Sequence, residues 1–499
     1  MTDTAEIDID AIAERAAAVA APYAALDPQV RAAGLVAAAD ALTAHADELI
    51  ELGTRETGLT RARLTGELKR TAVQLKLFAE VVADGAYLDV RVDDRDPDFA
   101  LGPRPELRRT LVPLGPVLNF AAGNFPFAFS VAGGDTAAAL AAGCPVVVKV
   151  HRGHPELSHR TAEIVGAALT AAGLPDGVLQ LVEGQAAGAA LLQHPLIKAG
   201  SFTGSTRGGR FLADLASARS APIPFFGELG SVNPVFVTPA ALAERGTAIA
   251  EGFVTSVSGS AGQLCTKPGL VFVPDDHGLD AAVATAVEPV AEHRLLDPRI
   301  ASSYRDGRDT ILRTPGVRVI AEGAVRVDDE GQGWVTPTVV AAALDTVRSS
   351  AELREECFGP LSILVEYPEG TDLAAVAADL FEGNLTSTLQ LASDESGDDV
   401  RALVQTLAER AGRVIVNGWP TGVAVTPAME HGGPWPATTS GGTSVGTAAI
   451  TRFLRGVAYQ DIPDALLPSP LQADNPWHLP QSHAAAGESV RWGAGSVRR

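Results

Sequence analysis

Residues 111–150 read LVPLGPVLNFAAGNFPFAFSVAGGDTAAALAAGCPVVVKV, a run in which two apolar segments flank a helix-like segment of small residues. Gly and Pro mark the turns between these parts. Parallel strands cannot be joined by a tight hairpin and need a crossover, usually a helix. The run therefore predicts a βαβ unit, and with it a parallel, doubly wound α/β sheet.

The sequence on either side extends this pattern. Apolar residues recur at helical spacing through residues 8–84, and a polar Asp/Pro-rich piece separates them from the first strand. The alternation of strands and helices continues to residues 225–239 and then restarts with a helix that ends near Ser258. We therefore expect two α/β domains that meet near Glu228.

The composition is that of an ordinary globular chain of 499 residues, with 46% hydrophobic and 20% charged residues and a net charge of −21. That charge argues against a nucleic-acid partner, because phosphate binding needs a basic face. The acidic N-terminus lacks the features of a signal peptide, and no stretch has the apolar length of a membrane span. Three widely spaced cysteines without a CxxC pair favour neither disulfides nor a zinc site. We expect a cytoplasmic protein with no metal, no nucleic-acid partner and no membrane anchor.

One cysteine differs from the others in its surroundings. Residues 258–270, SGSAGQLCTKPGL, place Cys265 among small residues instead of within an apolar run. A structural cysteine behaves as a small hydrophobe and belongs in apolar sequence. A reactive cysteine needs nearby backbone N–H groups and room for a substrate, which small residues provide. Cys144 and Cys357 are expected to be core thiols.

Four polar residues stand at turns beside apolar runs. Asn124, in GNFPFAFS, either caps a following helix, which is the commoner role, or donates to an oxyanion. Lys149 ends the strand PVVVKV at the sheet edge that binds ligands, although a lysine can also snorkel out of a core there. Glu228, in PFFGELGS, is either a general base or a salt-bridged loop carboxylate. Glu356, in REECFGP, is a second acid at an apolar turn.

Residues 201–210, SFTGSTRGGR, form a variant of the dinucleotide fingerprint between a strand and a helix. Gly204 and Gly209 would let a pyrophosphate approach the backbone at the helix N-terminus. An ordinary tight turn accounts for the same residues equally well.

Taken together, these motifs resemble those of one family, the aldehyde dehydrogenases. The Asn-Phe-Pro turn, the strand-ending lysine, FTGST, ELG, GQxCT and EExFGP occur in that family's order, from about Leu111 to Arg455. Longer stretches are similar to the 2-oxoglutarate semialdehyde (2,5-dioxovalerate) dehydrogenases and to a related NADP-linked fatty-aldehyde dehydrogenase. These stretches are ETGLTRARLTGELKRT, KVHRGHPELS, GQLCTKPGL, HGGPWPATT, TSVGTAAITRFLR and YQDIPDALLP.

The resemblance implies oxidation of an aldehyde to a carboxylic acid with NAD(P), through a cysteine adduct and a thioester. Cys265 would be the nucleophile, Asn124 and the Cys265 N–H the oxyanion donors, and Glu228 the base that activates water. Residues that would hold the cofactor are Lys149, Arg152, Gly204, Ser205, Gly209, Glu356 and Phe358. Residues expected at the substrate are Arg70, Phe125, Leu264 and Trp419.

The resemblance also implies the aldehyde dehydrogenase fold, with a Rossmann-like cofactor domain, a catalytic domain and a small β oligomerisation arm. A homodimer or homotetramer is expected, and the tail after Pro468 is atypical. The expected bounds are 1–92 and 113–229 for the dinucleotide-binding domain, 230–435 for the catalytic domain, and 93–112 with 436–499 for the arm and tail.

Particular residues bear on cofactor and substrate choice. Arg152 stands where many relatives have an acid that accepts ribose hydrogen bonds. Because arginine cannot accept but can pair with a 2′-phosphate, NADP is expected, with NAD as the alternative. Arg70 faces the remote carboxylate of a semialdehyde or is an ordinary surface arginine, and Trp419 walls the tunnel or packs in the core. The favoured substrate is 2-oxoglutarate semialdehyde, and a medium- or long-chain fatty aldehyde is the alternative.

Three other functions compete with this interpretation. A CoA-acylating dehydrogenase would pass the thioester to a thiol, which fits poorly with Glu228 as a base for water. A catalytically silent scaffold fits poorly with the joint presence of Cys265, Asn124 and Glu228. A cysteine hydrolase needs a histidine base, and none lies near Cys265 in the sequence, although one could lie near it in space.

Overall fold

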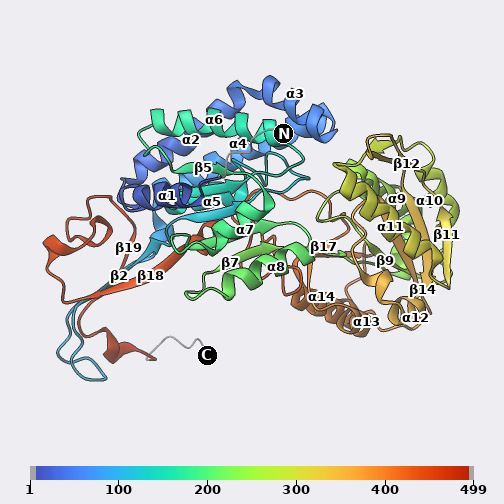
Figure 1. Ribbon diagram of the computed structural model, residues 1–499. Helices are drawn as coiled ribbons and strands as arrows, with labels where there is room; N and C mark the ends of the chain where they lie inside the picture. Colours follow the sequence, from blue (N-terminus) through green and yellow to red (C-terminus); the bar gives the residue numbers. More distant parts are fainter. Residues whose placement is uncertain (1–6, 494–499) are drawn as a thin grey trace.

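Two α/β domains and a small β arm make up the computed structural model, which describes residues 7–493 (Figure 1). The first sheet has five parallel strands in the order β5-β4-β3-β6-β7. Residues 111–150 supply β3, helix α5 and β4, so the expected βαβ unit is confirmed. The strands of this sheet are β3 (Val117–Phe120), β4 (Val146–Lys149), β5 (Leu179–Val182), β6 (Ala199–Thr203) and β7 (Phe225–Glu228).

Helices cover both faces of this sheet because its strands are apolar on both sides. Val117, Val146 and Val148 pack in one core with α2, α4, α5 and α6, whereas Leu118 and Val147 pack in another with α1, α7 and α8. Figure 1 shows α2, α4 and α6 on one side of the sheet and α7 and α8 on the other. The helices are α1 (Ile9–Ala24), α2 (Pro28–Ala44), α3 (Ala46–Thr57), α4 (Arg61–Asp84), α5 (Gly134–Ala142), α6 (Pro155–Ala171), α7 (Gln185–Gln193) and α8 (Thr206–Ser217).

Side-chain caps begin three of the first four helices, and left-handed glycines end two of them. Asp8, Asp27 and Thr60 cap α1, α2 and α4 by accepting backbone N–H bonds with their side chains. Gly58 and Gly85 end α3 and α4 at φ values of 71° and 75°, in the left-handed region that glycine adopts without a steric penalty. The helical spacing across residues 8–84 is thereby confirmed.

The second domain is built on a seven-stranded sheet in the order β11-β14-β15-β9-β8-β16-β17, parallel except where β11 meets β14. Its strands are β8 (Val235–Val237), β9 (Leu270–Pro274), β11 (Val317–Ala321), β14 (Thr338–Ala343), β15 (Leu361–Tyr367), β16 (Asn384–Gln390) and β17 (Ala411–Val416). Its helices are α9 (Pro239–Ser258), α10 (Asp280–Val287), α11 (Pro298–Arg313), α12 (Leu344–Ser349), α13 (Leu373–Leu380) and α14 (Asp398–Arg410). A side sheet joins β10 (His293–Arg294), β12 (Val325–Val327) and β13 (Gly333–Val335).

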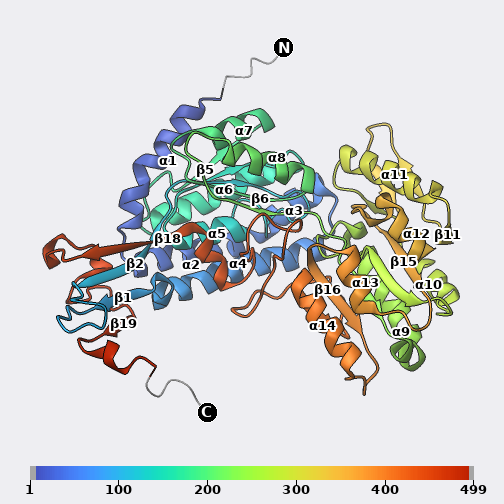
Figure 2. The same cartoon turned by 90° about the horizontal axis from the view of Figure 1, so that it is seen from below.

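The arm is a four-stranded sheet in the order β18-β2-β1-β19, at the end of the molecule away from the second domain (Figure 2). Its strands are β1 (Val90–Asp93), β2 (Leu107–Pro113), β18 (Leu454–Gln460) and β19 (Gln481–Ala484). Strand β19 comes from the tail after Pro468 and pairs in parallel with β1, so this tail completes the arm.

The return of the chain to the arm begins later than the position 436 suggested by the sequence. The helical turn η4 (Thr447–Phe453) contacts α5, and its residues Ala449, Ile450 and Phe453 are buried in the core of the first domain. Residues 447–453 therefore pack with the first domain, and only β18 onward belongs to the arm.

Candidate active site

A cavity of about 370 Å³ lies at the carboxyl ends of the first sheet, facing the second domain. The strand order reverses direction between β3 and β6, which is where open α/β sheets bind ligands. Loops after β3, β4, β6 and β7 meet three segments of the second domain there. The residues expected at the site that line this cavity are Asn124, Arg152, Gly204, Ser205, Glu228, Cys265, Glu356 and Phe358.

Cys265 reaches the cavity from a strained loop that follows α9. Ser260, Ala261 and Gly262 have φ values of 51°, 54° and 64°, and a non-glycine residue held there costs about 1–3 kcal/mol. A Cβ on Gly262 would lie 2.4 Å from the Gly359 carbonyl carbon, so only glycine fits at this crossing. Cys265 is half-buried and lines the cavity, whereas Cys144 and Cys357 are buried in apolar cores, as expected.

The sequence favoured a helix cap at Asn124, and that expectation is wrong. A turn follows Asn124, and the next helix, α5, begins only at Gly134. The Asn124 amide instead donates 3.1 Å to the backbone carbonyl of Gln263, two residues before Cys265. Within residues 7–493 the Cys265 N–H has no acceptor, and Asn124 and Cys265 line the same cavity.

Glu228 ends β7 and is buried against a histidine that the sequence reading did not identify. His431 Nε2 lies 3.2 Å from Glu228 Oε1 and 3.6 Å from Cys265 Sγ. Ser444 donates its hydroxyl proton to the other Glu228 oxygen. Burial alone raises the pKa of Glu228, but the charge of His431, the hydrogen bond from Ser444 and the charge of Arg452 outweigh it, so the pKa lies below its ordinary value. The carboxylate form is therefore favoured.

The pKa of the Cys265 thiol is shifted in the opposite direction to that of Glu228. Burial raises the pKa of the Cys265 thiol well above its usual range, and the negative charges of Glu228 and Glu356 add to this effect. The positive charge of Arg70 opposes it. In the protein alone the neutral thiol is favoured, so attack by sulfur requires a nearby base.

The position of His431 reopens the cysteine hydrolase alternative, since a histidine does lie beside Cys265. In a catalytic triad the nucleophile and the carboxylate contact different ring nitrogens. Here both face Nε2, and Nδ1 is buried with no partner among the described residues. This geometry disfavours a hydrolase triad. The motif HGGPWPATT contains His431, but only the fold brings it next to Cys265.

Helix α4 braces the loop that carries Asn124. Glu67 is 3% exposed and accepts the N–H groups of Phe127 and Ala128 at 2.8 and 2.9 Å, while its other oxygen pairs with Arg63. Arg63 also lies 4.4 Å above the ring of Phe125. Neither Glu67 nor Arg63 was singled out from the sequence, because a Glu–Arg pair four residues apart on a helix is the usual pattern of an exposed face.

The residues expected at the substrate differ in where they lie. Arg70 is half-buried over the ring of Phe129, and its Nη1 is buried without a hydrogen-bond partner in residues 7–493. Desolvation lowers the pKa of Arg70, and the negative charges of Glu67, Cys265 and Glu228 act against this. Leu264 is adjacent to Cys265 and half-buried. Trp419 packs 6.0 Å from the ring of Phe253 on α9, which is a core contact, and its role at the substrate stays a prediction.

The turn after β6 fits a dinucleotide. Ser205 caps α8 by accepting the Gly208 N–H at 3.3 Å, which leaves the helix N-terminus facing the cavity. A Cβ on Gly209 would lie 2.0 Å from Leu229, so glycine is needed for α8 to approach the end of β7. A Cβ on Gly230 would lie 2.5 Å from Glu356 Oε2, so this glycine also keeps the cavity open.

The remaining cofactor candidates surround the same space. Lys149 lies at the end of β4 but does not line the cavity, and no acceptor in residues 7–493 bonds its Nζ. Desolvation lowers the pKa of Lys149, and Arg152 adds to this. Arg152 pairs with Asp297 of the second domain at 3.3 Å. Desolvation raises the pKa of Glu356 to about 7, and Lys267 opposes this.

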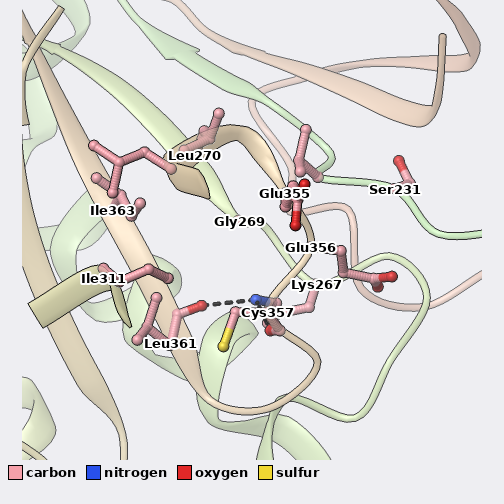
Figure 3. A pocket seen from close by; sticks show the side chains of 12 residues that line it. Ser231, Lys267, Gly269, Leu270, Ile311, Glu355, Glu356, Cys357, Leu361 and Ile363 are labelled. Atoms are coloured by element: carbon pink, nitrogen blue, oxygen red, sulfur yellow. Dashed lines mark hydrogen bonds between the residues drawn. The ribbon is translucent and has the colours of Figure 1, made fainter. Parts of the chain in front are cut away.

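A small pocket beside the cavity contains the buried Lys267 (Figure 3). Its Nζ donates to the carbonyls of Cys357 and Leu361 at 3.0 and 2.7 Å. Desolvation lowers the pKa of Lys267, whereas the charges of Cys357 and Glu356 raise it. Lys267 thereby ties the Cys265 loop to the turn that carries Glu356 and Phe358.

A cofactor sheet that faces a cysteine of a second domain is the architecture of the nicotinamide-dependent dehydrogenases that use a thiol. The chain belongs to the aldehyde dehydrogenase family, whose model matches residues 1–455. The family uses NAD(P) and acts on aldehydes. No helix in the described part of the chain has the length and apolar character needed to cross a membrane.

Individual relatives are similar over most of the chain. The alpha-ketoglutaric semialdehyde dehydrogenase 2 of Azospirillum brasilense is 45% identical over 483 residues, 96% of this chain and 91% of that protein. The alpha-ketoglutaric semialdehyde dehydrogenase of Acinetobacter baylyi is 41% identical over 438 residues, 87% of this chain and 82% of that protein. The structure of aldehyde dehydrogenase C from Pseudomonas syringae with NAD+ and octanal has a TM-score of 0.75 at 23% identity, covering 91% of this chain and 88% of that chain, which supports the fold alone.

Proposed function

We propose that this protein oxidises 2-oxoglutarate semialdehyde to 2-oxoglutarate, with NAD(P) as the oxidant and water as the source of the added oxygen. The observation that carries the proposal is that Cys265, Glu228 and Asn124, far apart in the sequence, line one cavity together with the fingerprint turn. Two relatives at 45% and 41% identity that are named for this semialdehyde support the choice of substrate.

The residues of the cavity divide the chemistry among them. Cys265 loses its proton to the Glu228–His431 pair, and its sulfur bonds to the aldehyde carbon. The aldehyde oxygen then accepts hydrogen bonds from the Asn124 amide and the Cys265 N–H, each worth about 3 kcal/mol in the transition state. A nicotinamide held beside the turn after β6 would supply the hydride acceptor for that carbon, and loss of the hydride would leave a thioester on Cys265. Glu228 takes a proton from the water that attacks the thioester, and the proton that the Glu228–His431 pair accepted first returns to the departing sulfur, so that the acid and the thiol are released.

The cations near the thiol support an anionic substrate. A negative charge on Cys265 acts on the pKa values of both Arg70 and Arg413, so both guanidinium groups belong to the electrostatic environment of the thiol. Arg70 Nη1 and Arg413 Nε are buried without a hydrogen-bond partner in residues 7–493. A buried donor left unpaired costs about 1–3 kcal/mol. The carboxylate of a semialdehyde would satisfy such donors, whereas a fatty chain would leave them unpaired.

NADP is the cofactor we favour, and Arg152 is the reason. Its guanidinium pairs with Asp297, a contact between the two domains at the mouth of the cavity. A 2′-phosphate would compete with Asp297 for this arginine.

Arg152→Ala should raise the KM for NADP more than the KM for NAD. Asp297→Asn, which keeps the cap of α11 at Arg299 and Ile300, should lower the KM for NADP; an unchanged NADP-to-NAD ratio in both variants would contradict the assignment.

The decisive experiment follows the formation of reduced nicotinamide with 2-oxoglutarate semialdehyde and with a long-chain aldehyde, each with NAD and NADP. Cys265→Ala is the blank. We expect turnover that depends on Cys265 and is selective for the semialdehyde. Preference for the long chain would move the assignment to fatty aldehydes, and added CoA without a change in product excludes the acylating alternative.

A homodimer or homotetramer and a cytoplasmic location belong to the same proposal. Strand β18 lies at the edge of the arm sheet, with no strand of residues 7–493 on its outer side. Three unpaired thiols suit a reducing compartment. Light scattering of the purified protein tests the oligomer, and a monomer would contradict it.

A further inference from the structure

The atoms around the thiol form a set of three metal ligands. Cys265 Sγ, His431 Nε2 and a Glu228 oxygen all lie within 4.8 Å of one another. They come from a loop after α9, a loop before η4 and the end of β7, so the fold and not a sequence motif assembles them. The absence of a CxxC pair predicted no metal site, because spacing in the sequence cannot show this arrangement.

The distances suit a tetrahedral ion. Zinc binds thiolate at about 2.3 Å, imidazole at about 2.0–2.1 Å and carboxylate at about 2.0–2.2 Å, so tetrahedral angles separate sulfur from nitrogen by about 3.6 Å and nitrogen from oxygen by about 3.3 Å. Here Sγ lies 3.6 Å from Nε2, and Nε2 lies 3.2 Å from Oε1. An ion could therefore enter with little movement of the nitrogen ligand.

The ligand atoms are buried and unsatisfied. Glu228 is 4% exposed, and its Oε1 has no hydrogen-bond partner among the described residues. His431 is fully buried, and its Nε2 faces both the thiol and this oxygen. A buried carboxylate oxygen without a donor, aimed at a thiol and an imidazole, is the environment that a cation would satisfy.

Neighbouring groups hold these ligands in place and leave one side open. Ser444 donates its hydroxyl proton to the second Glu228 oxygen, and Thr443 Oγ1 accepts the backbone N–H of His431 at 2.8 Å. Such outer contacts orient ligands and strengthen metal binding. Cys265 and Glu228 line the cavity, so the fourth position can hold water. The positive charges of Arg70 and Arg413 oppose a cation at the thiol, and the negative charge of Glu356 offsets part of this repulsion.

We infer that the enzyme without cofactor binds one thiophilic divalent cation, with Zn²⁺ as the best fit, through Cys265 Sγ, His431 Nε2 and Glu228 Oε1. Hard cations such as Mg²⁺ prefer oxygen ligands and should not bind there. Because the ion takes up both the thiol and the carboxylate, it inhibits the enzyme. The inhibition rests on the proposed function, whereas the binding does not.

Co²⁺ is the probe, because thiolate-bound tetrahedral cobalt has a charge-transfer band and intense visible bands. The wild type should bind one Co²⁺ that Zn²⁺ displaces and Mg²⁺ does not. Cys265→Ser should lose the charge-transfer band, and His431→Gln and Glu228→Gln should each weaken binding by about 100-fold or more, because losing a ligand costs at least as much as losing an outer partner, about 10- to 100-fold. Cys144→Ala removes a core thiol outside the cluster and should bind like the wild type.

The outcomes separate the two parts of the inference. No charge-transfer band in the wild type, or equal affinity in Cys265→Ser and in both glutamine variants, overturns the site. If one glutamine variant fails to fold, as judged by circular dichroism, the other still decides the ligand set. Cobalt bound through Cys265 with full aldehyde oxidation would overturn the inhibition and the role of Cys265 together, while leaving the metal site intact.

Discussion

The side-chain amide of Asn124 donates a hydrogen bond of 3.1 Å to the backbone carbonyl of Gln263. A primary amide has two N–H donors, so this bond leaves one free. Gln263 is itself buried, and its Oε1 accepts the Leu296 N–H at 2.9 Å, so the carbonyl that holds Asn124 is fixed. The free amide N–H and the Cys265 N–H are therefore available to an oxygen that gains charge on the reacting carbon.

Asn124→Ala removes one of these donors. We expect kcat to fall about 100- to 1000-fold, because the donor acts on charge that develops in the transition state. The KM for the cofactor and the rate of Cys265 alkylation by iodoacetamide should change little, since neither involves an oxyanion. Steady-state kinetics and mass-spectrometric labelling measure both. A loss of kcat that is matched by an equal loss of alkylation would instead point to a displaced Cys265 loop.

Glu67 is expected to stabilise the loop that carries Asn124, because it accepts backbone N–H groups of that loop. Glu67→Leu leaves the N–H groups of Phe127 and Ala128 buried without an acceptor, at about 1–3 kcal/mol each, so the free energy of unfolding should fall by about 2 kcal/mol or more. Glu67→Gln keeps an acceptor oxygen and loses only the Arg63 ion pair, so it should retain most of the stability and the activity. Urea unfolding and kcat measurements test this pair. Equal behaviour of the two variants would show that the ion pair, and not the acceptor, holds the loop.

The fold could be predicted from the sequence because its signals are local. The run at 111–150 contains both strands and the helix of one βαβ unit, and its apolar residues cover both faces of the sheet. The resumption of the pattern after Glu228 marks the second sheet. The packing of residues 447–453 against the first domain was not predicted, because it joins segments that are far apart in the chain. Ala449 of η4 and Ala139 of α5 lie in the same core, although they are 310 residues apart in the sequence.

Only part of the candidate site could be predicted from the sequence. Cys265, Asn124, Glu228 and the fingerprint turn lie in distinctive motifs, and all of them line the cavity. His431 and Glu67 lie in stretches whose local pattern is that of a loop histidine and a surface helix. Their roles depend on the packing of distant segments against Glu228 and Phe127, which spacing along the chain does not encode.

The Cys265 thiol should titrate above the usual range of a cysteine, because burial and the charges of Glu228 and Glu356 disfavour the thiolate. Alkylation of the enzyme without cofactor should therefore be slow at pH 7 and rise only at alkaline pH. Glu228→Gln removes a negative neighbour and should shift the profile to lower pH, whereas Arg70→Met removes a positive one and should shift it to higher pH. Stopped-flow alkylation with Cys265→Ala as the blank measures the shifts. Shifts in the same direction would contradict this electrostatic account.

Lys267 is expected to act on the cofactor through the turn that it holds. Lys267→Met keeps the length of the side chain but leaves the carbonyls of Cys357 and Leu361 without their donor. It also removes the charge that opposes the raised pKa of Glu356, so that carboxyl, already near 7, should ionise at still higher pH.

The wild-type KM for the cofactor should fall as the pH rises through about 7, because the carboxylate offers both oxygens to the ribose hydroxyls as charged acceptors, whereas the protonated form keeps one O–H donor. In Lys267→Met this fall should move to higher pH, and the KM at pH 7 should rise more than the KM for the aldehyde. Lys198→Met is the matched control, since Lys198 is exposed and donates to a single loop carbonyl, that of Pro195. A general loss of stability would raise both KM values at every pH, whereas a displaced pH profile confined to the cofactor requires that Lys267 act through Glu356.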